Sequence, residues 1–242
     1  MVAVNGVLRD KSWKYATRTP LSLPGRAAVA LLSAAGALMD PKRADLVAAL
    51  GETSGGDSFR RMRDRMLASS TGRQILEDRP RITKEFMERA AQLPPNTLGG
   101  AYASFMGRRG FDPDERAPVR FIDDDELAYV VQRAREVHDL WHVMFECPTT
   151  VLGELQLKAL EFVQTGMPMC ALSVLGAQTR LRASDRQLLW STYVPWAVRA
   201  GTRSRDLMCI YYENHLEDDL QEFRARFRIE PAPRRPDARP GW

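Results

Sequence analysis

The sequence predicts an all-α protein, a single domain of packed helices with a candidate metal motif on a central helical hairpin. Apolar residues recur at helical spacing in most segments, whereas the alternating runs typical of strands are few. The strongest apolar stripe lies between residues 123 and 147 and contains two histidines one turn apart. Proline and glycine mark turns between the predicted helices, which favours a compact bundle.

Length and composition fit one domain. The chain has 242 residues, of which 44% are hydrophobic, enough for a sizeable core. Its net charge is +4, but acids and bases interleave through the middle of the chain, which argues against nucleic-acid binding. Three widely spaced cysteines without a C-x-x-C pair favour neither a disulfide framework nor a zinc ribbon. Since no apolar run reaches the ~18 residues of a membrane-spanning helix, we expect a protein that is soluble or lies on a membrane.

The predicted organisation has three parts. Residues 1–19 form a basic N-terminal arm, residues 20–230 the helical domain, and residues 231–242 a flexible tail with nothing to bury. The basic start has three interpretations: the remnant of a mitochondrial transit peptide, an arm lying on anionic lipid, or an irregular soluble N-terminus.

The first half of the chain is predicted as helices and turns. Residues 27–39 are small and apolar, typical of a helix that is buried or lies on a membrane. The glycine-rich stretch 51–56 lacks the Gly-Lys-Ser/Thr of a phosphate-binding loop, so we interpret it as a hinge or cap. The other helices predicted here are residues 41–50, a helix capped by Ser58, residues 82–93 and residues 101–106.

The central helix is predicted to begin at Asp123 and to run to about Cys147. Asp123 and Glu126 resemble a capping box, and Pro148 cannot continue the helix.

The helix after Pro148, capped by Thr149 or Thr150, should run through Gln164 and complete the hairpin. Another should start at Ser184, kink at Pro195 and end near residue 200. The final helix is marked by apolar residues at helical spacing, namely Leu216, Leu220, Phe223 and Phe227.

The motif on the hairpin has the spacing of a metal site. At about 100° per residue, His138 and His142 lie roughly 40° apart, and Asp139 lies about 60° beyond His142. After an antiparallel turn at Pro148, Glu154 returns to the level of His142. We therefore predict His138, Asp139, His142 and Glu154 as metal ligands.

The donor set leaves several metals and two simpler interpretations open. Two imidazoles and two carboxylates suit a divalent metal, zinc foremost, and would also suit iron(II), cobalt or manganese. Alternatively, the histidines are hydrogen-bonded core residues, and Glu154 belongs to a polar stripe with Lys158 and Glu161. The pattern is not the protease motif H-E-x-x-H, because Asp139 replaces the glutamate. Nor does it fit an HD-type phosphohydrolase, which needs another histidine upstream.

The arrangement H-D-x-x-H, eleven residues, E resembles the signature of the coenzyme Q (ubiquinone) biosynthesis protein family numbered four in the yeast series. The resemblance covers roughly residues 20 to 230, and all four motif positions match. Further segments similar to family blocks are residues 50–55, 79–82, 126–130, 135–139, 148–154, 164–169, 195–197 and 211–213.

This resemblance implies a dimeric, all-helical, peripheral protein of the mitochondrial inner membrane on the matrix side, or of the cytoplasmic membrane surface in a bacterium. It implies other coenzyme Q biosynthesis proteins as partners and no nucleic acid. The implied reaction is oxidative decarboxylation of a polyprenylated hydroxybenzoate, in which a hydroxyl replaces the ring carboxylate. The implied metal ligands, which are also the implied catalytic residues, are His138, Asp139, His142 and Glu154.

Two functions of different classes follow. In the first, the metal centre carries out the decarboxylation, and Arg133 or Arg135 pairs with the substrate carboxylate or with Glu136. In the second, the protein is a lipid-binding scaffold that organises the biosynthetic complex, and its metal is structural.

Overall fold

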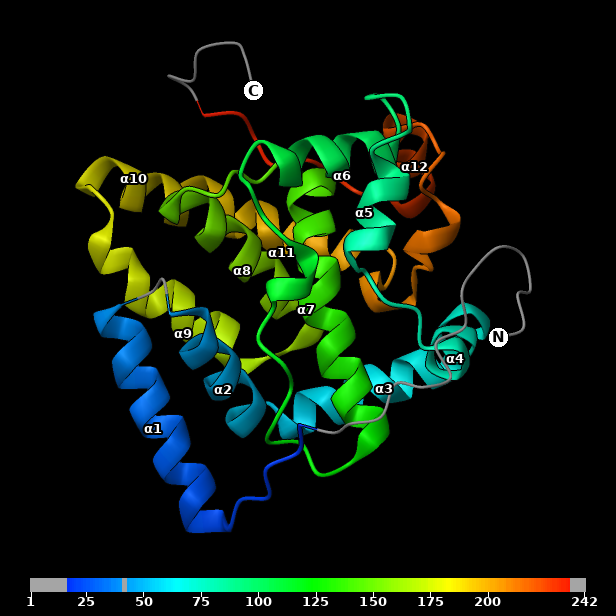
Figure 1. Ribbon diagram of the computed structural model, residues 1–242. Helices are drawn as coiled ribbons and strands as arrows, with labels where there is room; N and C mark the ends of the chain where they lie inside the picture. Colours follow the sequence, from blue (N-terminus) through cyan, green and yellow to red (C-terminus); the bar gives the residue numbers. More distant parts are fainter. Residues whose placement is uncertain (1–16, 41–42, 236–242) are drawn as a thin grey trace.

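The computed structural model describes residues 17–40 and 43–235, which fold as helices packed around one long central helix (Figure 1). That helix is α7, Asp125–Phe145. Within these residues the β structure is an isolated bridge between Thr97 and Asp219. The predicted all-α class and the central helical hairpin are thereby confirmed.

The remaining helices lie on both sides of α7 in the sequence. Before it come α1 (Leu23–Met39), α2 (Ala44–Ser54), α3 (Gly56–Ala68), α4 (Ser70–Asp78), α5 (Lys84–Ala90) and α6 (Leu98–Gly107). After it come α8 (Val151–Thr165), α9 (Pro168–Ala177), α10 (Ala183–Leu188), α11 (Val194–Arg203) and α12 (Leu220–Phe227). Helices α3, α6 and α8 all pack against α7, and α8 also packs against α9 and α11.

The glycine-rich stretch contains a sharper break than the sequence predicted. Helix α2 continues through Gly51 to Ser54, and α3 starts only two residues later. The break is Gly55, where a Cβ would lie 2.4 Å from Cζ of Phe59. Ser58 is not the predicted cap, since it lies inside α3 and its hydroxyl donates to the carbonyl of Gly166 at 2.6 Å.

Several helix boundaries differ because turn chemistry decides them. Helix α4 was not predicted as a separate element; it ends at Arg79, whose φ of 48° is left-handed, directly before Pro80. The helix predicted over 82–93 shrinks to α5, capped by the hydroxyl of Thr83. The helix predicted from residue 101 begins at residue 98, because Thr97 caps it.

The C-terminal helices depart from the prediction in two places. Ser184 does not start a helix, because α10 already includes residue 183 and has no side-chain cap. The irregularity predicted at Pro195 is a π-helical turn, Leu189–Tyr193, directly before α11. Leu216 is buried but precedes α12 rather than forming part of it.

Both edges of the predicted domain are tied to the fold. The hydroxyl of Thr17 donates to the carbonyl of Val119 at 2.5 Å. At the other end, Ala232 is buried and its N–H donates to the carbonyl of Phe145 at 2.7 Å. The prediction of a tail with nothing to bury is therefore wrong for residues 231–235. Residues 236–242, and the basic arm as far as residue 16, lie outside the described residues.

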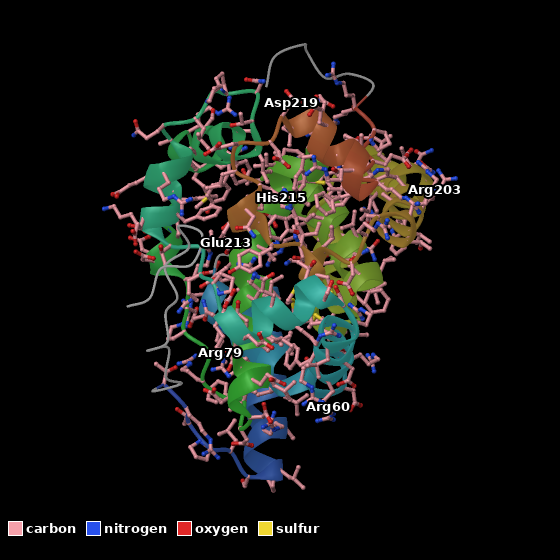
Figure 2. All side chains as sticks on the ribbon, turned by 90° about the vertical axis from the view of Figure 1, so that its right-hand side faces the viewer. Arg60, Arg79, Arg203, Glu213, His215 and Asp219 are labelled. Atoms are coloured by element: carbon pink, nitrogen blue, oxygen red, sulfur yellow. The ribbon has the colours of Figure 1, made fainter. Side chains whose placement is uncertain are left out.

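One main core runs from α2 to α12 with Trp141 inside it. The indole N–H of Trp141 donates to the hydroxyl of Tyr212 at 2.9 Å, and that hydroxyl donates to the carbonyl of Leu207 at 2.9 Å. Tyr212 belongs to the segment between α11 and α12, along which Glu213, His215 and Asp219 follow one another in Figure 2. This segment is therefore part of the structure that holds α7 in place.

Helix α1 lies at the outer edge of the molecule (Figure 1) and turns an apolar side to solvent. Its one charged residue, Arg26, instead donates inward to the carbonyls of Glu52 and Phe121. We call the exposed residues of this helix the α1 apolar face: Leu23, Pro24, Ala27, Ala28, Leu31, Leu32, Ala35 and Met39. Among the described helices, none has the length and apolar character that would be needed to span a bilayer.

Candidate metal centre

Helix α7 positions both histidines in its last two turns. Its first turn is capped by Asp124, whose carboxylate accepts from the N–H of Leu127 at 2.8 Å, one residue later than the predicted cap. The helix ends where Glu146 adopts a left-handed φ of 54°. His138 and His142 thus lie one turn apart on a helix that is anchored at both ends.

Helix α8 brings the glutamate back to the histidines. Thr150 is the cap, since its hydroxyl accepts from the N–H of Gly153 at 3.2 Å. The helix ends at Gly166, whose φ of 67° is left-handed. Glu154 therefore lies in the first turn of α8 and faces the last turns of α7.

The turn between these helices depends on a close approach at Gly153. A Cβ there would lie 2.0 Å from the carbonyl oxygen of Pro148. We expect Gly153→Ala to lower the free energy of unfolding by about 1–3 kcal/mol, measured by urea denaturation. Gly107→Ala is the matched control: its Cβ would meet nothing within 4 Å, so its effect should stay within about 1 kcal/mol. Equal stability of the two variants would contradict this account of the turn.

Three side chains from the two helices converge, and we call them the metal group: His138, His142 and Glu154. The Nε2 atoms of His138 and His142 lie 3.1 Å apart. Oε1 of Glu154 lies 3.2 Å from Nε2 of His142, and its Oε2 lies 3.8 Å from Nε2 of His138. These candidate ligand atoms all lie within 4.8 Å of one another.

Hydrogen bonds at the far side of each ring fix which nitrogen faces the group. Nδ1 of His138 lies 2.6 Å from the Glu161 carboxylate, and Nδ1 of His142 lies 2.8 Å from the carbonyl oxygen of Cys147. Both partners can only accept, so each Nδ1 carries the hydrogen. In the neutral imidazoles both Nε2 lone pairs then point into the group, which is the arrangement that a metal ligand needs.

The charges in the group also suit a cation. Burial opposes the ionised form of Glu154, but the neighbouring His142 outweighs it and lowers the pKa of Glu154 to about 2. Burial alone would lower the pKa of His142, yet Glu154 raises it above its usual value. Glu154 is therefore a carboxylate at neutral pH and can supply an oxygen ligand.

The donor set fits a catalytic metal. Two histidines and one carboxylate provide the three protein ligands of many catalytic zinc sites and of iron(II) oxygenases, in which the other coordination positions remain open. The side chains of His138 and Glu154 are 21% and 37% exposed, whereas that of His142 is only 1% exposed. The accessible side of the group is therefore the side of His138 and Glu154.

The structure does not bring Asp139 to this group. Its carboxylate pairs with Arg116 at 2.6 Å. Arg116 is held by the carbonyls of Ile82 and Pro113, each at 3.0 Å. The predicted convergence of Asp139 with the histidines is therefore not seen, because Arg116 from the preceding loop pairs with its carboxylate.

The hypothesis that Arg133 or Arg135 pairs with Glu136 is wrong. Arg133 is 1% exposed and pairs with Glu213, while Arg135 pairs with Glu52 at 2.5 Å. Glu136 instead accepts from the guanidinium of Arg81 at 2.5 Å. Both arginines form ion pairs with distant segments of the chain, so neither guanidinium is available to a substrate carboxylate.

Residues that the sequence did not single out surround the group. The ring of Phe105 stacks on His142 with centroids 5.4 Å apart, and Arg109 lies over Phe105 at 3.9 Å. Glu161 and Lys158, interpreted from the sequence as part of a polar stripe, turn inward, with side chains 3% and 17% exposed. The seven-residue spacing from Glu154 to Glu161, which puts both on one helix face, was the available signal.

Comparison with known proteins gives a consistent result along nearly the whole chain. The family described as "Coenzyme Q (ubiquinone) biosynthesis protein Coq4" matches residues 15–233. The mitochondrial ubiquinone biosynthesis protein COQ4 of Arthroderma otae is 46% identical over 230 residues, which cover 94% of this chain and 86% of the relative. The mitochondrial protein of that name from Aspergillus terreus is 48% identical over 223 residues, which cover 91% and 77%.

A solved structure shares the fold. The crystal structure of a Nostoc punctiforme protein described as a ubiquinone biosynthesis protein matches 83% of this chain and 97% of its own chain, with a TM-score of 0.66. At 20% sequence identity, this likeness supports the helical arrangement alone.

Proposed function

The chain belongs to the Coq4 family of coenzyme Q (ubiquinone) biosynthesis proteins, and from this premise we propose that its metal centre carries out an oxidative decarboxylation. A role in ubiquinone biosynthesis follows from the family. The proposed substrate is a polyprenylated hydroxybenzoate, whose ring carboxylate is removed and replaced by a hydroxyl on the same carbon. This exchange is a net two-electron oxidation, for which we propose dioxygen as co-substrate: it accepts the two electrons and leaves as hydrogen peroxide, while water balances the hydroxyl oxygen.

The observation that carries the proposal is the convergence of His138, His142 and Glu154. These three residues would hold a divalent ion, which supplies a Lewis acid for a carboxylate or phenolic oxygen when bound. The two rings are fixed by hydrogen bonds at Nδ1, so they present their lone pairs without rearrangement. Zinc remains the first choice, and the two-histidine, one-carboxylate set supports iron(II) as the alternative for chemistry with dioxygen.

Apolar side chains beside the group support an aromatic, prenylated substrate. Phe105 packs against His142 and makes an edge contact with Phe111, with the two phenyl centroids 6.5 Å apart. Phe111 is 44% exposed, and Val151, one turn before Glu154, is 46% exposed. An apolar ligand that covered these side chains would gain about 25 cal/mol for each Å² removed from water.

The α1 apolar face supports a membrane-surface location, which we place at the matrix side of the mitochondrial inner membrane. A surface helix normally turns charged residues to water, whereas this face has none. The face follows the length of α1 from Leu23 to Met39. A helix lying flat on a bilayer surface would bury this face.

We expect Leu31→Glu/Leu32→Glu to weaken binding to vesicles of phosphatidylcholine and an anionic phospholipid by at least about 100-fold. Both leucines are 73% exposed, and burying each is worth about 1.5–3 kcal/mol. Co-sedimentation measures the effect. Leu67→Glu, a 41% exposed leucine on α3, is the matched control and should bind like the wild-type protein. Equal binding by all three proteins would show that α1 does not contact the membrane.

The scaffold function remains the second candidate. The α1 apolar face also fits a lipid-binding protein that presents a prenylated intermediate to other coenzyme Q biosynthesis proteins, with a structural metal. The two functions differ in what the metal site does: a scaffold needs it for folding or assembly, and an enzyme needs it for turnover.

One experiment tests the proposed function directly. The purified protein is analysed for bound metal and then incubated with a prenylated hydroxybenzoate under oxygen. We expect about one divalent ion per chain, loss of CO2 from the ring and a hydroxylated product. A protein that binds no metal at any stage would overturn the enzyme proposal.

A further inference from the structure

We propose that Glu161 is a positioning residue of the metal centre: it holds His138 in the tautomer and orientation that present Nε2 to the metal. The inference rests on the proposed metal function. Glu161 lies on α8, two turns after Glu154, and its Oε1 is 2.6 Å from Nδ1 of His138. Its side chain is 3% exposed, so the carboxylate is shielded from bulk solvent.

The carboxylate of Glu161 is itself held on its other oxygen. Nζ of Lys158 donates to Oε2 at 2.5 Å, and the thiol of Cys170 from α9 lies 3.5 Å from the same atom. The lysine offsets the buried negative charge. Oε1 is therefore left to accept from His138, and the ring direction is set by contacts on two helices.

The two histidines differ in what orients them. Nδ1 of His142 donates to a main-chain carbonyl, that of Cys147, which no side-chain replacement removes. Nδ1 of His138 depends on Glu161 alone among the described contacts. Without that acceptor, the hydrogen of His138 can move to Nε2, where it would point at Nε2 of His142, 3.1 Å away, and block a metal.

A double variant tests the inference. Lys158→Met/Glu161→Leu removes the carboxylate and the lysine together, so no buried charge is left unpaired. Asp218→Asn is the matched control, because Asp218 makes the same kind of contact, 2.8 Å from Nδ1 of His215, outside the metal group.

The first readout is the tautomer of each histidine in metal-free protein, from long-range proton–nitrogen NMR spectra. The chain has three histidines, so assignment is tractable. In the wild-type protein we expect the hydrogen on Nδ1 of His138 and His142. In the double variant, His138 should shift toward the Nε2–H form while His142 stays unchanged.

The second readout is the affinity for zinc and cobalt(II), from calorimetry. Loss of a group that orients a metal-bound histidine typically weakens binding about 10–100-fold, and we expect that range for the double variant and no change for Asp218→Asn. An unchanged His138 tautomer together with unchanged affinity would overturn the inference and leave the proposed function intact. If the wild-type protein binds no metal, the proposed function fails, while the NMR spectra still decide whether Glu161 sets the ring of His138.

Discussion

Replacing His142 by alanine is expected to abolish metal binding and to lower turnover of a prenylated hydroxybenzoate by about three orders of magnitude. A metal that stabilises developing charge contributes several kcal/mol to a transition state, and each 1.4 kcal/mol corresponds to about tenfold in rate. His142 is the most buried of the three convergent residues and contacts both others. Its loss removes one proposed ligand and the stacking partner of Phe105.

Metal content and product formation are measured on the purified variant, with its thermal unfolding recorded to confirm the fold. His215→Ala is the matched control, because it removes a histidine that packs against Phe223 and Phe227 and has no contact with the metal group. In cells, the carboxylated precursor should accumulate while the biosynthetic complex still assembles. Lost assembly with unchanged chemistry on purified components would favour the scaffold function instead.

Asp139→Asn, compared with Glu154→Gln, tests whether the metal site has three protein ligands or four. Because the Asp139 carboxylate pairs with Arg116 and lies outside the convergent group, we expect this variant to keep its metal, whereas Glu154→Gln should lose it. Loss of metal from both variants would restore the four-ligand set that the family motif implies.

The second large effect is expected from the buried pair Arg133–Glu213. Arg133→Met should lower the free energy of unfolding by about 3–5 kcal/mol, because it leaves an uncompensated carboxylate in the core. The side chains are 1% and 4% exposed, and two guanidinium N–H groups donate to the two carboxylate oxygens at 2.5 and 2.9 Å. Although burial opposes the charge, Glu213 raises the pKa of Arg133, so the guanidinium stays charged in the core.

The double variant Arg133→Met/Glu213→Leu should regain most of that loss, since a hydrophobic replacement of a buried ion pair is often neutral. Urea denaturation measures both variants, and an unchanged slope with denaturant shows that the denatured state is comparable. Arg199→Met is the control, because its partner Glu230 is 38% exposed and exposed pairs contribute about 0–1 kcal/mol. A double variant no more stable than Arg133→Met would show that the pair itself, rather than one unpaired charge, stabilises the fold.

Local signals predicted the hairpin well. The acidic start of α7, the proline after it and Thr150 before α8 act on residues next to them in the chain. The helix ends that they determine can therefore be predicted from the sequence alone. The placement of His138, His142 and Glu154 follows from helix spacing and one short turn. The reaction came only from the family resemblance, because no spacing of ligands specifies a substrate.

Long-range partners could not be predicted in this way. Arg116 reaches Asp139 across 23 residues, and Glu213 reaches Arg133 across 80. The polar stripe with Lys158 and Glu161 has the spacing of an exposed charge pair, and only the packing of α9 beside α8 shows that it is buried. Charged residues were therefore the ones whose roles the sequence misassigned.

The left-handed residue that ends α7 has a consequence for how this site can change. Because Glu146 turns the chain back, the carbonyl of Cys147 accepts a hydrogen bond from Nδ1 of His142. The orientation of His142 is thus set by a main-chain acceptor, whereas that of His138 depends on the side chain of Glu161. In the proposed metal centre, substitutions at residue 161 would therefore change metal affinity through His138 and leave the ring of His142 in place.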